Sequence, residues 1–101
     1  MATPIVSDAT ELDRFEAHLD GVLCGTLTYI NKRERLALIH TEVLPAFEGK
    51  GVGSAITRFA LDSARERGLK VIVMCPFVRS YLDRHPEHND IVVGGGAPAS
   101  G

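Results

Sequence analysis

Three glycines alternate with other residues at positions 49, 51 and 53, between an apolar strand and an amphipathic helix. The stretch from Thr41 to Ser54 reads Thr-Glu-Val-Leu-Pro-Ala-Phe-Glu-Gly-Lys-Gly-Val-Gly-Ser. Alternate glycines let backbone N–H groups converge without obstruction by Cβ atoms, and the helix that follows adds free amides and the positive end of its dipole. The chemistry that this arrangement favours is anion binding, in the form of a phosphate cradle.

Two other phosphate-binding motifs do not match this loop. A P-loop needs a glycine, four residues and then Gly-Lys-Ser/Thr, whereas Gly49-Lys50 is followed by Gly51 and position 44 is leucine. A dinucleotide fingerprint needs glycine where Ser54 stands, and an acidic residue about 20 residues further on, where the chain reads Lys-Val-Ile at 70–72. A glycine-rich turn before a helix can also be only a tight turn, so its structural context has to decide.

Composition limits the kind of ligand. A chain of 101 residues, 45% hydrophobic and 24% charged, fits one domain with a single core. A net charge of −2 supplies no broad attraction for nucleic acid or an acidic membrane, and no apolar run approaches the ~20 residues that span a bilayer. Cys24 and Cys75, in a chain without a charged-then-apolar leader, favour free thiols in an unprocessed cytoplasmic protein. We expect a soluble monomer that binds a small ligand and neither nucleic acid nor membrane.

The apolar pattern predicts the elements that must position the loop. In chain order they are strands 14–19, 22–30 and 35–43, a helix over 51–67, a strand over 69–75, a short helix over 78–84 and a brief edge strand over 91–93. Asp20-Gly21 supplies a hairpin turn, Pro45 ends the third strand and Gly68 ends the first helix. Residues 1–93 therefore form a single domain, and residues 94–101, which lack apolar anchors, are expected to be a mobile tail.

The strand, helix and strand over 35–75 make a β-α-β unit, so the two strands should be parallel with a right-handed crossover. Their C-terminal ends then share one edge of the sheet, where ligands of open α/β sheets bind. That edge gathers the glycine loop, His40 and Glu42 from the first strand, and Cys75 with residues 76–81 from the second. The topology predicts one site there.

The block from Val43 to Gly53 resembles the acyl-CoA motif of the GNAT acetyltransferase superfamily, in which Arg/Gln-x-x-Gly-x-Gly/Ala binds a pyrophosphate. Together with His40-Thr-Glu-Val43 and the segment from Cys75 to Glu87, the likeness covers residues 11–93 and is to small, single-domain N-acetyltransferases that lack the usual N-terminal helices. The resemblance implies an α/β (α+β) fold, the minimal GNAT acyl-CoA N-acyltransferase fold. Its antiparallel strands lead into a β-α-β crossover with splayed parallel strands.

The resemblance also implies acetyl-CoA as cosubstrate, without a metal. The backbone of Val43 and Leu44 would pair with the pantetheine arm. The pyrophosphate position falls on the amides of Gly49, Lys50, Gly51, Val52, Gly53 and Ser54. Glu48 stands where the superfamily has Arg or Gln, and a carboxylate beside a pyrophosphate is unfavourable, so we expect Glu48 at the rim and Lys50 to supply the lost charge. Arg79 would face CoA from the helix that follows.

Acetyl transfer to an amine needs a base, because a lysine-like amine with a pKa of ~10.4 is protonated at neutral pH. His40 and Glu42 lie two apart on a strand, so they share a face about 6.5 Å apart, and either is a candidate base. Cys75 is a candidate either to accept the acetyl group or to protonate the departing CoA sulfur. The resemblance makes Tyr81 the rival general acid.

Several alternatives stay open at this point. The acceptor is a protein side chain, a polyamine or another small amine, because the helices that shape acceptor pockets in larger relatives are missing. A metal site at Cys75, His85 and His88 is disfavoured, since Pro86 breaks the helical spacing and structural zinc sites usually have four ligands. The other functional readings are a noncatalytic acyl-CoA-binding module and a small interaction protein without a cofactor.

Overall fold

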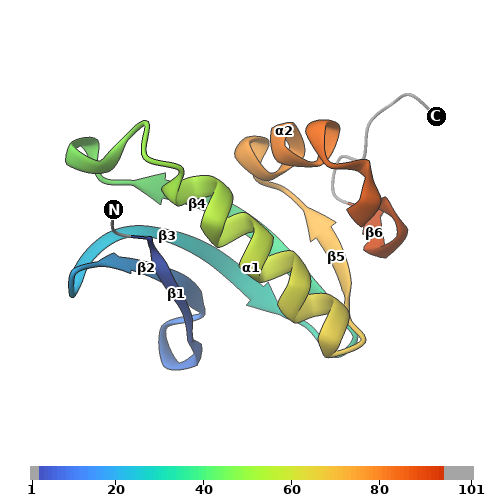
Figure 1. The fold of residues 1–101 in the computed structure, drawn as a ribbon. Coiled ribbons are helices and arrows are strands. Elements are labelled where there is room, and N and C mark those ends of the chain that lie inside the picture. Colours follow the sequence, from blue (N-terminus) through green and yellow to red (C-terminus); the bar gives the residue numbers. More distant parts are fainter. Residues whose placement is uncertain (1–2, 95–101) are drawn as a thin grey trace.

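A computed structural model describes residues 3–94 of the chain, and these form a mixed six-stranded sheet with helices on one face (Figure 1). The strands are β1 Ile5–Ala9, β2 Arg14–Leu19, β3 Val22–Asn31, β4 Arg35–Val43, β5 Lys70–Val73 and β6 Val92–Gly94. The α-helices are α1 Val52–Glu66 and α2 Pro76–Arg84, and the 3₁₀ helices are η1 Thr10–Leu12, η2 Pro45–Phe47 and η3 Pro86–Ile91. Strands β1 to β4 pair antiparallel in order, and β4 with β5 and β5 with β6 pair parallel.

The predicted hairpin and the β-α-β unit are confirmed. Asp20 and Gly21 connect β2 to β3, and α1 carries the chain from β4 to the parallel strand β5. The first strand was not predicted, because Ile5-Val-Ser-Asp-Ala is a short segment with little apolar alternation. Its place depends on tertiary contacts: it pairs along β2, and the Tyr29 hydroxyl donates a hydrogen bond of 2.6 Å to Asp8. The antiparallel part of the sheet therefore has one strand more than the sequence indicated.

Some predicted boundaries shift. Strand β5 ends at Val73 and not at residue 75, because its pairing with β4 stops there. Helix α2 begins at Pro76, whose missing N–H costs nothing at the first helical position. The edge strand includes Gly94. The rest of the expected tail, residues 95–101, lies outside the described residues.

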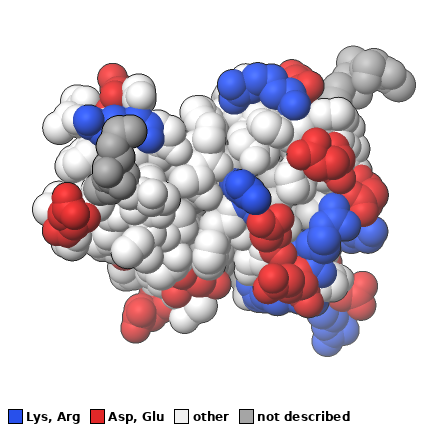
Figure 2. All heavy atoms as spheres, in the orientation of Figure 1, with Lys and Arg blue, Asp and Glu red and all other residues white. Residues whose placement is uncertain are grey.

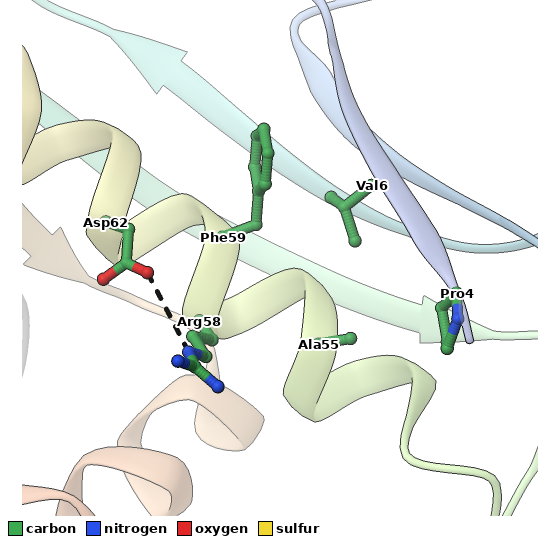
Figure 3. A pocket seen from close by; sticks show the side chains of 6 residues that line it. All are labelled: Pro4, Val6, Ala55, Arg58, Phe59 and Asp62. Atoms are coloured by element: carbon green, nitrogen blue, oxygen red, sulfur yellow. Dashed lines mark ion pairs between the residues drawn. The ribbon is translucent and has the colours of Figure 1, made fainter.

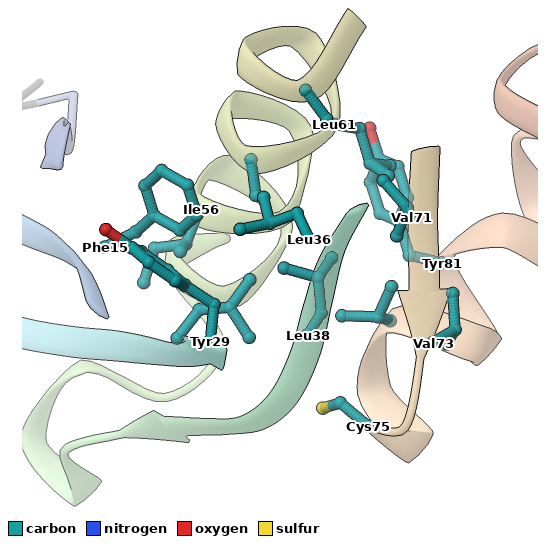
Figure 4. Close-up of a cluster of buried hydrophobic side chains, with 14 of the residues drawn as sticks. Phe15, Tyr29, Leu36, Leu38, Ile56, Leu61, Val71, Val73, Cys75 and Tyr81 are labelled. Atoms are coloured by element: carbon teal, nitrogen blue, oxygen red, sulfur yellow. The ribbon is translucent and has the colours of Figure 1, made fainter. Parts of the chain in front are cut away.

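The core lies between the sheet and the two α-helices (Figure 4). Helix α1 buries residues four apart on its inner side, including Val52, Ile56 and Ala60, against Phe15 and Leu38 of the sheet. Fully burying one such large apolar side chain contributes about 1.5–3 kcal/mol. Among residues 3–94, no helix covers the opposite face of the sheet, where Ile30 of β3 and Met74, which directly follows β5, are exposed.

Strand β1 borders α1 along a shallow hollow of about 290 Å³ (Figure 3). Its lining consists of Pro4, Val6, Ala55, Arg58, Phe59 and Asp62. Arg58 and Asp62, one helical turn apart, form an ion pair of 3.9 Å there and balance each other's charge. None of the residues predicted for the site lies in this hollow.

Segment η3 is tied to α1 by a bidentate ion pair between Arg65 and Asp90, with N–O distances of 2.8 and 2.7 Å. The hydrogen bonds from Arg65 lower the pKa of the Asp90 carboxyl to about 2. Because the folded-state pKa is depressed, the pair stabilises the fold above the ordinary pKa of an aspartate, and this contribution is lost as the pH falls from about 4 to about 2. We expect Asp90→Asn to remove that part of the acid dependence, measured by urea unfolding at stepped pH.

Asp83→Asn is the matched control, since Asp83 is an exposed carboxylate in α2 without an ion pair among residues 3–94. It should keep the acid profile of the unmodified protein. The effect of Asp90→Asn should shrink at high salt, because both partners of the pair are exposed. Identical acid profiles for Asp90→Asn and the unmodified protein would mean that the pair adds nothing to stability.

Candidate active site

Strands β4 and β5 separate at their C-terminal ends. Their register runs from Arg35 opposite Lys70 to Leu38 opposite Val73, and the Met74 amide donates to the Leu38 carbonyl at 2.9 Å. Beyond that point β4 continues to Val43 beside β3 alone, with an extra residue, Ile39, in a bulge. The chain after β5 turns into α2 instead. A gap between the two strands follows, bounded by residues 40–43 and 74–76.

The backbone edge of β4 that borders this gap belongs to Thr41 and Val43. The Leu44 amide donates to the Cys24 carbonyl at 3.0 Å, so Leu44 bonds toward β3. Successive residues of a strand direct their N–H and C=O groups to opposite sides, so Val43 and Thr41 direct theirs toward the gap. Of the two residues predicted to pair with pantetheine, Val43 therefore directs its backbone toward the gap. The Leu44 amide is engaged with β3, and the Leu44 carbonyl accepts from Phe47 at 2.8 Å.

Cys75 lies at the gap beside a residue that the sequence reading missed. The Thr41 Oγ1 and Cys75 Sγ atoms are 3.1 Å apart, close enough for a hydrogen bond in which either atom is the donor. The Cys75 side chain is 3% exposed and its sulfur is not in a disulfide. Threonine is common in strands, so only the alternation of β4, which turns Thr41 to the face of Cys75, marks it as a site residue.

His40 and Glu42 flank Thr41 along β4 and point to the opposite face, which no helix of the described residues covers. Both are exposed, opposite Thr28 and Thr26 of β3, and they share a face as expected. Neither side chain forms an ion pair or hydrogen bond within residues 3–94. Consecutive Cα atoms are about 3.8 Å apart, so the backbone of each residue adjoins Thr41 at the gap while its side chain leaves on the other face.

The glycine loop follows η2 and leads into α1. Gly49 and Gly51 have φ angles of 80° and 78°, and a Cβ at either position would meet open space. The first i to i−4 bond of α1 joins the Ala55 amide to the Gly51 carbonyl at 3.0 Å. The amides of Val52, Gly53 and Ser54 therefore have no acceptor within the helix, which is the anion-binding arrangement of a helix N-terminus.

Gly53 also has a packing role. A Cβ at Gly53 would lie 2.6 Å from the Phe77 ring of α2, so the glycine allows the two helices to approach closely. The side chain of Val52 is buried in the core at 1% exposure, which leaves only its backbone for a ligand. Lys50 and Glu48 are both exposed beside the loop. The sequence reading missed Phe77, and the three alternate glycines do not share one role.

The remaining predicted residues lie on α2. The Arg79 amide bonds to the Cys75 carbonyl at 3.1 Å, which places Arg79 one turn beyond the thiol. Tyr81 is 5% exposed and stacks on His85 with ring centroids 4.2 Å apart, and burial raises its pKa. Figure 4 shows its hydroxyl directed toward Leu61 and away from Cys75. The structure does not bring the Tyr81 hydroxyl to the gap.

Charge and metal-binding groups near the site are sparse. On the face in Figure 2, Lys and Arg side chains interleave with Asp and Glu and do not form one basic patch. No group of three or more His, Cys, Asp or Glu residues within residues 3–94 could hold a metal ion. No helix in that range is long and apolar enough to cross a membrane. An anion at this site would therefore depend on the loop amides and a few nearby side chains.

Comparison with solved structures supports the assignment of the fold. A GCN5-like protein from Staphylococcus aureus superposes with a TM-score of 0.67 at 23% identity, over 89% of this chain and 88% of that one. A GNAT family acetyltransferase from Brucella melitensis, solved in complex with acetyl-CoA, gives a TM-score of 0.59 at 23% identity, over 71% and 50%. At these identities the likeness establishes the fold alone.

Sequence relatives cover shorter stretches. Protein NATD1 of Homo sapiens is 34% identical over 58 residues, which are 57% of this chain and 50% of that protein. Streptothricin acetyltransferase of Streptomyces lavendulae is 43% identical over 51 residues, 48% of this chain and 27% of that enzyme. The chain thus spans about half the length of NATD1. Residues 14–91, most of the chain, match the model of the GCN5-related N-acetyl-transferase family. The chain belongs to that family.

Proposed function

We propose that this protein is an acetyl-CoA-dependent N-acetyltransferase that moves an acetyl group to an amine. The observation that carries the proposal is the gap between β4 and β5. Thr41 and Val43 on one side of it have a backbone edge that no strand within residues 3–94 pairs with, and the Cys75 thiol lies on the other side. A pantetheine arm contains amides that can pair with such an edge. The acetyl-CoA complex of the Brucella melitensis relative supports this choice of cosubstrate.

Along the chain, Thr41 and Val43 at the gap come before the glycine loop. The thioester, the pantetheine arm and the pyrophosphate follow one another in the same order along acetyl-CoA. The pyrophosphate would bind the amides of residues 49–54, where Lys50 adds a positive charge. The pantetheine arm would pair with Val43, and the thioester would reach Thr41 and Cys75. Arg79, one turn beyond Cys75, would border the cosubstrate from α2.

The reaction requires two proton movements. The amine nitrogen attacks the thioester carbonyl carbon and the carbon–sulfur bond breaks, while the amine proton passes to a base and the CoA sulfur gains a proton. Glu42 is the proposed base, because it adjoins both Thr41 and Val43, and His40 is the alternative. The Thr41 and Cys75 pair, 3.1 Å apart, is the nearest hydrogen-bonded group that could return a proton to sulfur.

Calorimetry with acetyl-CoA, followed by a CoA-release assay against a panel of amines, tests the proposal. Binding together with transfer to at least one amine is the expected result. Tight binding without transfer to any amine would favour a noncatalytic acyl-CoA-binding module. Absence of binding for both acetyl-CoA and CoA would overturn the proposal.

Glu42→Gln is expected to lower kcat by about 10²–10⁴-fold, the usual effect of losing a general base, while acetyl-CoA affinity stays unchanged. The amide keeps the shape of the side chain and cannot accept the proton. Steady-state CoA release at saturating amine measures the change. His40→Gln is the matched control, since His40 lies on the same exposed face one residue on the other side of Thr41. A larger loss in His40→Gln would reassign the base to His40.

A further inference from the structure

The uncovered face of the sheet contains a small hollow directly beside Glu42. Its lining is Arg14 of β2, Leu23, Gly25 and Thr26 of β3, and Glu42 with Leu44 at the end of β4. Its volume is about 150 Å³. Thr26 and Glu42 are directly opposite each other in the β3–β4 register, so the hollow and the gap lie on the two sides of the same strand end.

A β-bulge forms this hollow. Ala17 of β2 pairs with Gly25, and His18 pairs with Leu23, so Cys24 is an extra residue on β3. Its side chain turns into the core, where Sγ donates to the Ala17 carbonyl at 3.3 Å. Leu23 and Thr26 consequently stand on the same uncovered face, and the backbone of Gly25 lies between them as a floor.

The charges of the lining leave one carboxylate unbalanced. Arg14 is already paired, because its Nε and Nη2 atoms lie 2.9 and 2.8 Å from the same oxygen of Glu16. Glu42 has no ion pair within residues 3–94. A cationic ligand is therefore favoured, with its charge at Glu42.

The shape and the apolar lining restrict the rest of that ligand. Leu23 and Leu44 offer apolar surface, and Leu44 is 40% exposed. One water occupies about 30 Å³ of liquid, so the hollow takes roughly five groups of that size. A straight alkyl chain that ends in an ammonium group, such as the side chain of lysine or a free butylamine, meets both the size and the polarity.

We propose that this hollow binds the alkylammonium part of the acetyl acceptor, either a lysine side chain or a free alkylamine of similar length. The role of the hollow in catalysis rests on the proposed acetyl transfer. The binding of an amine in the hollow does not depend on that proposal. The ammonium group lies at Glu42 and gives its first proton to that carboxylate. The neutral amine then attacks the thioester carbonyl carbon on the gap side of β4, the carbon–sulfur bond breaks, and the second nitrogen proton passes to the departing CoA sulfur, directly or through the Thr41 and Cys75 pair.

Amide NMR spectra of the labelled protein, free and saturated with CoA, test the binding. Butylamine and Nα-acetyl-lysine amide are titrated separately, with butanol as the uncharged probe. We expect both amines to shift the amide signals of Leu23, Gly25 and Thr26, and butanol to bind at least tenfold more weakly. Tighter binding of the lysine derivative identifies a polypeptide acceptor, and tighter binding of butylamine identifies a free amine. Shifts confined to other parts of the protein, or none at millimolar amine, overturn the proposal.

Thr26→Phe fills the hollow, and Thr28→Phe is its matched control on the same face and strand, outside the lining. We expect Thr26→Phe to weaken amine binding at least tenfold and to leave acetyl-CoA affinity unchanged, while Thr28→Phe changes neither. Equal amine affinity in both variants contradicts the assignment. If calorimetry detects no binding of acetyl-CoA, the proposed acetyltransferase function is refuted. The amine titration of the free protein would still test whether the hollow binds an amine.

Discussion

Gly51→Val is expected to weaken acetyl-CoA binding by about 100-fold or more, about 2.7 kcal/mol, while the protein remains folded. Gly51 has a φ of 78°, a conformation that costs other L-residues about 1–2 kcal/mol and is worst for a β-branched side chain. The loop will therefore leave this conformation, and its amides will no longer converge on one anion. A hydrogen bond to a charged group contributes about 1.5–3 kcal/mol, so the loss of one or two such bonds gives the expected change. Calorimetry measures the affinity, and circular dichroism checks the fold.

Gly68→Val separates this effect from general destabilisation. Gly68 follows α1 at its other end, has a φ of 70°, and likewise has open space where a Cβ would stand. The two variants should lose similar stability in urea unfolding, and only Gly51→Val should lose acetyl-CoA affinity. If both variants keep the affinity of the unmodified protein, the loop does not bind the cosubstrate.

The β-α-β unit could be predicted because each of its boundaries has a local signal. Pro45 ends the first strand, Gly68 follows the helix, and the strand after it is a short apolar run. The divergence of β4 and β5 has no such signal. It depends on where the pairing stops, at Leu38 and Val73, and on a bulge that no local residue pattern marks. Strand β1 was missed for a similar reason, since its place depends on β2 and on the Tyr29 hydroxyl.

In the candidate site, too, features with a local sequence signal could be predicted, and features that depend on distant contacts could not. Side-chain alternation along β4 predicted the shared face of His40 and Glu42, because the period of a strand is local. The sequence could not separate Val43 from Leu44, because the direction of backbone hydrogen bonds also alternates, and the partner strand β3 decides which residues face it. Thr41 could not be chosen without Cys75, which is 34 residues away in the sequence. Contacts between distant segments therefore decided what the sequence alone left open.

Cys75→Ala is expected to lower kcat by about 10²-fold or more, with acetyl-CoA affinity nearly unchanged. Among residues 3–94, Cys75 supplies the only thiol at the gap, and alanine can neither donate a proton to the CoA sulfur nor accept an acetyl group. Thr41→Val should reproduce part of this loss, because it removes the hydroxyl partner and keeps the side-chain shape. CoA release under saturating acetyl-CoA and amine measures both variants.

Cys24→Ala is the matched control for Cys75→Ala. Both cysteines are buried and free, and each sulfur has an oxygen partner, at 3.3 Å for Cys24 and 3.1 Å for Cys75. Burial raises the pKa of Cys24, so this side chain stays a protonated thiol, and it lies away from the gap. The Cys24→Ala variant should therefore have the same kcat as the unmodified protein. Mass spectrometry after incubation with acetyl-CoA alone then distinguishes the two thiol mechanisms. An acetyl group on Cys75 indicates a covalent intermediate, and its absence in an enzyme that depends on Cys75 indicates protonation of the CoA sulfur. Full turnover in Cys75→Ala would exclude both, because neither step can proceed without the thiol.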